Sequence, residues 1–152
     1  MQIATVEHRR ERIRREMIAA LDANPDLTEY GIGLYEDYPR RRSPAEHQAA
    51  LTTEHRELSD LVERDFTTFV HAVDWLYRQP RRASVNRDVG SSYGLKHVFS
   101  AQTGIYISNG RFILAALVAG VKITRKPHSP RHAMRMTTGW CDIGWRWRCC
   151  RR

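Results

Sequence analysis

The stretch that decides the fold is SNGRFILAALVAG, residues 108–120. Ser108 suits a helix N-cap, and Gly120 suits the left-handed position that commonly follows a helix. These two residues predict a helix over about Arg111–Ala119. Residues 112–119 are apolar nearly all the way round, and a helix of that kind is usually buried. We therefore expect this helix to lie in the core of a mainly α-helical fold.

The N-terminal half predicts two further helical segments. An amphipathic pattern covers about Thr5–Asp22 and ends at Asn24-Pro25, because a residue before proline is pushed away from the helical conformation. A second helix should begin after Ser43, which forms a capping box with Glu46 and is followed by a proline at the first helical position.

This second helix is predicted to run over about 44–78. Its apolar residues recur at steps of three, four or seven, which keeps them on one face: Leu51, Leu58, Val62, Phe66, Phe69, Val73 and Leu76. The span is long for one globular helix. Either it breaks near Thr52-Thr53, or its face forms the seam of a homodimer.

The C-terminal half predicts a small unit of different character. Ser92 is expected to cap a short helix that runs to about Gln102, ahead of the apolar helix. Two extended pieces, Val121–Arg125 and Arg131–Thr137, could form a β-hairpin. Helix, turn, helix and hairpin in this order is the layout of a winged helix-turn-helix.

The predicted fold class is therefore mainly α, with a helical N-terminal half, a helix-turn-helix-like unit and a short hairpin wing. We expect three regions: 1–82, 92–137, and a tail over 138–152.

Charge divides the chain more sharply than hydropathy does. Residues 1–90 carry 14 Arg or Lys and 16 Asp or Glu, whereas residues 91–152 carry 11 Arg or Lys and a single acid, Asp142. A region with a net charge of +10 suits a polyanion, with nucleic acid first. Arginine accounts for 22 of the 25 basic residues, which fits phosphate binding or, equally, the codon composition of a GC-rich genome.

These observations predict a non-enzymatic nucleic-acid-binding protein, with DNA the favoured ligand. Binding should rest mainly on phosphate contacts, because the apolar helix offers no Asn, Gln or Ser on its only candidate outer face to read a base edge. The alternative is a protein-interaction module or inhibitor that presents a basic face to an acidic or nucleic-acid-binding partner. The predicted contact residues are Lys96, Arg111, Lys122, Arg125, Lys126, Arg131 and Arg135.

Other classes find little support in the sequence. The longest apolar run, 112–119, is far shorter than the ~20 residues of a membrane span, and no signal peptide is visible, so we expect a cytoplasmic protein without membrane contact. No nucleophile elbow or P-loop is present. We therefore expect neither catalysis nor a cofactor.

A zinc site is the one metal hypothesis that the sequence raises. His128 and His132 have the spacing of a zinc half-site, and Cys141, Cys149 and Cys150 follow. The two last cysteines are adjacent and no C-x₂-C knuckle occurs, so we predict no metal and no disulfide framework.

The tail over 138–152 leaves several interpretations open. Its tryptophans alternate with arginines, a pattern that suits stacking on single-stranded bases or contact with a membrane interface. Packing on the core, or an end produced by a shifted reading frame, would give the same composition.

Two motifs resemble a pattern found in short uncharacterised proteins of plasmids and phages. They are YGLKH, residues 93–97, and YISNGRFI, residues 106–113, followed by Ala115-Ala116. The resemblance covers about Ser92–Val121 and, more loosely, Tyr30–Tyr38. It implies a mobile-element or host-conflict setting, assigns no activity and no catalytic residues, and suggests that Cys141–Arg152 departs from the usual ending.

Overall fold

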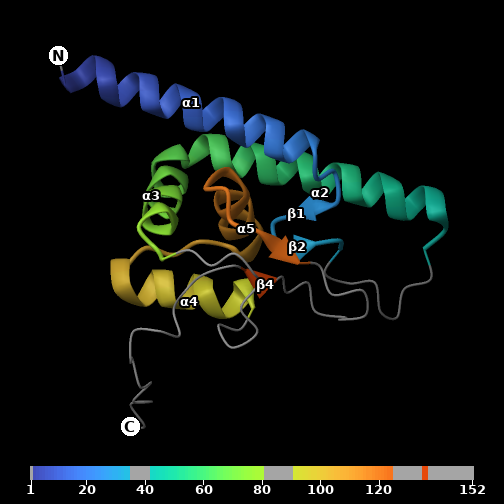
Figure 1. The fold of residues 1–152 in the computed structure, drawn as a ribbon. Helices are drawn as coiled ribbons and strands as arrows, with labels where there is room; N and C mark the ends of the chain where they lie inside the picture. The colour runs from blue at the N-terminus through green and yellow to red at the C-terminus, as the bar shows by residue number, and fades with distance from the viewer. Residues whose placement is uncertain (1, 35–41, 81–90, 125–134, 137–152) are drawn as a thin grey trace, which may run out of the picture.

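A computed structural model describes residues 2–34, 42–80, 91–124 and 135–136 of the chain (Figure 1). This part of the chain is mainly helical, which confirms the predicted fold class. The helices are α1 (Gln2–Asp22), α2 (Pro44–Arg64), α3 (Phe66–Tyr77), α4 (Ser92–Thr103) and α5 (Asn109–Val118).

Two short antiparallel strand pairs accompany the helices. β1 (Leu27–Thr28) pairs with β2 (Gly31–Ile32), and β3 (Ile123–Thr124) pairs with β4 (Arg135–Met136). The second pair confirms the predicted hairpin after α5, while its connection, 125–134, lies outside the described residues.

Helix α5 is the centre of the fold, as its sequence predicted. It contacts α1, α3 and α4 as well as the β1–β2 pair, and Figure 1 shows it enclosed by these elements. Every side chain from Phe112 to Ala116 is fully buried. Ser108 caps the helix by accepting a hydrogen bond from the backbone N–H of Arg111, and Gly120 adopts a φ of 71° just beyond the C-cap. The apolar character of α5 therefore serves packing on all sides.

An aromatic cluster joins the two halves of the chain. Trp75 of α3 meets Phe99 of α4 edge to face at 5.7 Å between ring centroids, and both rings lie 6.1 Å from the ring of Phe112. The Trp75 indole N–H donates to the side-chain oxygen of Gln102 at 2.9 Å. One continuous hydrophobic core thus includes residues from both sides of the expected 82–92 boundary.

The β1–β2 turn is pressed against the N-terminus of α5. The Gly110 backbone N–H donates to the Glu29 carbonyl at 2.7 Å, and the Asn109 side chain donates to the Tyr30 carbonyl at 2.9 Å. A Cβ on Gly110 would overlap the carbonyl oxygen of Thr28. Only glycine allows so close an approach of two backbones.

The expected long helix over 44–78 breaks at Asp65. This residue leaves the helical conformation, with φ −125° and ψ 52°, and its side chain accepts from the Thr68 N–H to cap α3. At the predicted break near residues 52–53 the helix continues, and both threonine hydroxyls donate to carbonyls four residues earlier. The prediction of that position was therefore wrong: aspartate competes for backbone N–H groups and favours a cap.

The apolar face of this segment is buried within one chain. All seven residues that defined the face are buried: Leu51, Leu58, Val62, Phe66, Phe69, Val73 and Leu76. A homodimer seam would need the same side chains at the surface. The capping box at the start of α2 is present as predicted, with Glu46 accepting from both the backbone N–H and the hydroxyl of Ser43.

Candidate nucleic-acid interface

Helix α4 is the first helix of the basic half, residues 91–152. It is capped by Ser91, one residue earlier than predicted, because Ser92 is fully buried while the Ser91 side chain accepts from the Gly94 N–H. Gly104, with a φ of 72°, ends the helix and starts the turn to α5. The inward face of α4 packs Leu95 and Phe99 against the core.

Three aromatic side chains lie beside this inward face. Tyr93 and His97 lie one turn apart on α4 and meet edge to face at 4.6 Å between ring centroids. Tyr106, in the turn between α4 and α5, keeps 70% of its surface exposed, and Tyr93 keeps 55%. These are large rings that contribute little to the core.

Lys96 connects the two tyrosines. Its ammonium nitrogen lies 4.7 Å from the ring centroid of Tyr93 and 5.3 Å from that of Tyr106, within cation–π distance of both. Although its stem starts on the inward face of α4, the ammonium reaches the exposed rings, as long amphipathic side chains do. We call Tyr93, Lys96, His97 and Tyr106 the tyrosine–lysine face.

Burial sets the electrostatics of this face. Only 6% of Lys96 is exposed, and loss of hydration lowers the pKa of its ammonium below the ordinary value of 10.5. Among the described residues no carboxylate opposes this effect. Acids are also absent from the neighbouring sequence, since the last acid before α4 is Asp88 and the next is Asp142. Within the part of the chain that the structure describes, the cation of this face therefore contacts aromatic rings and no carboxylate.

Arg111, the other predicted contact residue on the helix pair, is engaged inside the protein. Its guanidinium lies 3.5 Å from a carboxylate oxygen of Asp65, and its Nε donates to the Ser108 hydroxyl at 3.3 Å. Only 11% of the side chain is exposed. Arg111 thus ties the start of α5 to the α2–α3 junction, and little of it remains for a phosphate.

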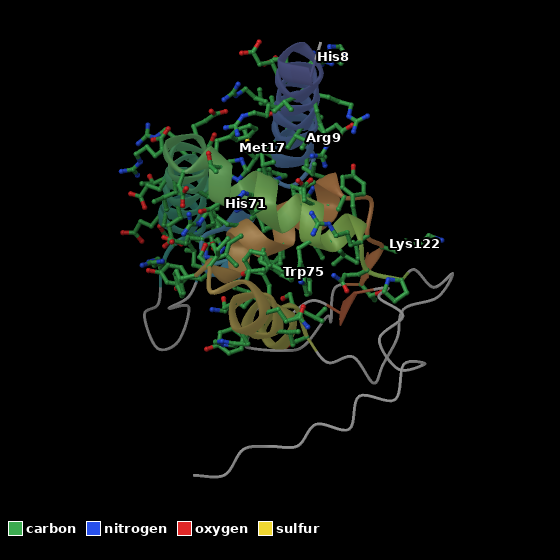
Figure 2. All side chains as sticks on the ribbon, turned by 90° about the vertical axis from the view of Figure 1, so that its left-hand side faces the viewer. His8, Arg9, Met17, His71, Trp75 and Lys122 are labelled. Carbon is green, nitrogen blue, oxygen red and sulfur yellow. The ribbon has the colours of Figure 1, made fainter. Side chains whose placement is uncertain are left out.

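The remaining predicted residues fall on or around the hairpin. Lys122 is exposed between α5 and β3 and points away from the helices (Figure 2). Arg135 lies on β4, where it is in register with Thr124. The other three, Arg125, Lys126 and Arg131, lie outside the described residues.

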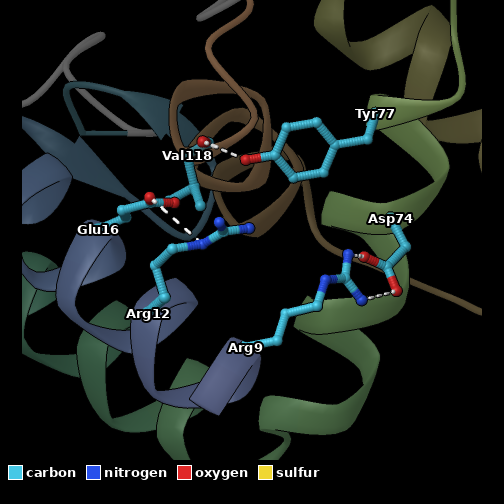
Figure 3. A network of polar contacts seen from close by, with 6 residues as sticks. All are labelled: Arg9, Arg12, Glu16, Asp74, Tyr77 and Val118. Carbon is cyan, nitrogen blue, oxygen red and sulfur yellow. Dashed lines mark hydrogen bonds and ion pairs between the residues drawn. The ribbon is translucent and has the colours of Figure 1, made fainter. Parts of the chain in front are cut away.

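The arginines of α1 are largely occupied by other parts of the chain. Arg9 makes a bidentate pair with Asp74 of α3, with Nη1 donating at 3.0 Å and Nη2 donating to the second oxygen (Figure 3). Arg14 pairs with Glu63 at 3.2 Å while its guanidinium lies 4.4 Å from the ring centroid of Phe66. These contacts hold α1 on α2 and α3.

Helices α4 and α5 and the β3–β4 pair follow one another along the chain in the predicted order. However, α5 is covered by α1, α3 and α4, so it offers no exposed face to a DNA groove. Among the described residues of the basic half, α4, the α4–α5 turn and the β3–β4 pair remain as candidate contact elements.

The described residues bring together no group of three metal-ligating side chains, and the predicted half-site residues His128 and His132 lie outside them. Of the helical histidines, His55 contacts the Leu27 carbonyl at 2.9 Å through Nδ1, whereas His71 is exposed on α3 (Figure 2).

None of the helices that the structure describes is long and apolar enough to cross a membrane.

The tyrosines of the face were not among the predicted contact residues. The spacing of Tyr93, Lys96 and His97 could have placed those three together on a helix that starts at Ser92. Tyr106 follows a helix end and has no such signal.

No protein-family model, curated protein or solved structure matches this chain significantly.

Proposed function

We propose that this chain is a non-enzymatic nucleic-acid-binding protein that contacts its ligand mainly through phosphates. The observation that carries the proposal is the net charge of +10 over residues 91–152, with no acid between Asp88 and Asp142. A folded surface usually mixes charges of both signs, whereas a region of one sign attracts a polyanion and speeds its association.

The contrast between the two halves supports this assignment. In the N-terminal half, Arg9 and Arg14 are matched by carboxylates on neighbouring helices. In the basic half, Lys96 pairs with tyrosine rings and Lys122 is exposed. Exposed positive charge attracts a phosphate backbone, and each phosphate that it neutralises releases condensed counterions.

The burial of α5 favours weak sequence selectivity. Base-specific reading of a duplex requires an element that enters a groove with hydrogen-bonding side chains, and α5 is enclosed by other helices. We further propose DNA as the ligand, a cytoplasmic location, and the regulation of a mobile element as the setting that the resemblance implies.

The test is a titration of labelled nucleic acid with the full chain across a range of salt concentrations. The logarithm of the association constant should fall linearly with the logarithm of salt concentration, by about 0.9 for each duplex phosphate neutralised. Absence of binding at low salt, or binding that does not depend on salt, would refute the proposal.

A matched pair of variants localises the effect. Lys122→Gln removes one exposed charge from the basic half and should reduce the salt slope by about 1. Arg15→Gln removes one exposed charge from α1, gives the same net charge, and should leave the slope unchanged. Equal effects of both variants would show that the basic half does not carry binding.

A further inference from the structure

We propose that the tyrosine–lysine face binds single-stranded nucleic acid, with unpaired bases stacked on Tyr106 and Tyr93 and Lys96 supplying the positive charge beside them. This inference rests on the proposed function and names the form of nucleic acid that the same half of the protein takes. It does not depend on the hairpin or on the tail.

The first argument is the exposure of the rings. Tyr106 is the most exposed large hydrophobic side chain among the described residues, and Tyr93 stands next to it around the same ammonium. By contrast, the hydroxyl of Tyr77, also partly exposed, donates to the Val118 carbonyl. Tyr93 and Tyr106 thus present ring surface that the core does not use.

The second argument is the position of the cation. Lys96 is largely removed from water, and among the described residues its ammonium is compensated by the faces of two rings. A cation–π contact contributes less than a charge-assisted bond to a phosphate oxygen, so an approaching phosphate improves the environment of the ammonium. A base stacked on Tyr106 brings its own phosphate to the neighbourhood of that group.

The third argument separates single strands from duplexes. In a duplex the base faces are already stacked on one another, and only edges and phosphates are accessible. In a single strand every base offers a π-face, which is why aromatic side chains beside basic ones are the common device of single-strand binding. The helix predicted to meet a duplex groove, α5, is buried, whereas the exposed rings of Tyr93 and Tyr106 can stack on unpaired bases.

The experiment compares binding of the full chain to labelled oligo(dT), oligo(U) and a DNA duplex of equal length by fluorescence anisotropy at one low salt concentration. The oligo(dT) and oligo(U) arms separate DNA from RNA as the source of the unpaired bases. We expect the wild-type chain to bind at least one single strand more tightly than the duplex.

The decisive variant is Tyr106→Ala. It should weaken single-strand binding by about 5- to 150-fold, which corresponds to the loss of one stacked base, and should leave duplex binding unchanged. Tyr106→Phe keeps the ring and should retain wild-type affinity. Because Tyr106 is mostly exposed, both variants should fold, which circular dichroism checks.

The matched control is Tyr77→Ala, which removes a partly exposed tyrosine near the opposite end of α5 (Figure 3). It should not change single-strand affinity. Equal affinity for single strands and duplex, together with no effect of Tyr106→Ala, would overturn this inference and leave the proposed function intact. No binding of any of the three probes would overturn both.

Discussion

Replacement of Gly110 by alanine should destabilise the protein, although the helix propensities alone predict the opposite. Gly110 lies in the first turn of α5, and alanine is favoured over glycine in a helix by about 1 kcal/mol. The tertiary structure reverses this sign. The new Cβ would overlap the Thr28 carbonyl oxygen and lie 2.8 Å from the Glu29 carbonyl oxygen.

The size of the effect follows from what has to move. The obstructing atoms belong to the backbone of β1 and its turn, so no side chain can rotate away. Overpacking of this kind costs about 1–3 kcal/mol. Displacing the turn also breaks the 2.7 Å hydrogen bond from Gly110 to Glu29, and leaving the buried Gly110 N–H unsatisfied costs about 1–3 kcal/mol more. After subtraction of the propensity gain, the net loss is about 1–5 kcal/mol.

Urea unfolding followed by circular dichroism measures this loss as a lower midpoint with an unchanged slope. The matched control is Gly94→Ala in the first turn of α4, where an added Cβ meets no atom within 4 Å. That variant should be stabilised by up to about 1 kcal/mol. If Gly110→Ala proves as stable as Gly94→Ala, the close approach of the two backbones does not govern this site.

Three further results are expected. Asp74→Ala removes the bidentate partner of Arg9 and should lower the free energy of unfolding by about 1 kcal/mol at low salt, with a smaller loss at high salt; a loss independent of salt would contradict an electrostatic origin. In Ser43→Ala, Glu46 loses the hydrogen bond from the Ser43 hydroxyl but keeps the one from the backbone N–H of residue 43, so its pKa, which both bonds lower from 4.5, should return part of the way toward that value in an NMR titration. The wild-type protein should lose this source of stability as the pH falls below 4.5 through the folded-state pKa, and an unchanged titration would show that the hydroxyl does not contribute. Burial lowers the pKa of Lys96, so the unfolded state binds more protons than the folded state between the folded-state pKa and 10.5, and the stability of the wild type should rise with pH in this window. Lys96→Met should abolish this rise in urea unfolding, and a rise that persists would assign it to another group.

Local signals in the sequence predicted much of the fold. The burial of α5 followed from an apolar run between a capping serine and a glycine, and the start of α2 followed from Ser43, Pro44 and Glu46. These features depend on residues within one or two helical turns of one another. The break at Asp65 was missed because an apolar face that continues across residue 65 masked a capping aspartate, and periodicity was given more weight than the cap.

The candidate site was predicted only in part. Lys96 and Arg111 both appeared as basic residues of a helix pair, yet one lies against two tyrosine rings and the other pairs with Asp65. Tyr106 joined the face through a turn that no periodic pattern covers. Charge alone cannot distinguish these environments, because the partners of a basic side chain depend on elements that are distant in the sequence.

The sequence by itself determined the helices, their buried faces and the concentration of positive charge after residue 90, because hydrogen bonding within a helix, apolar periodicity and composition are properties of neighbouring residues. Only the tertiary structure decided which charged side chains form internal ion pairs and why alanine at position 110 destabilises the fold. Those outcomes depend on contacts between residues tens of positions apart, such as Arg9 with Asp74 and Gly110 with Glu29, which form only when the helices pack around α5.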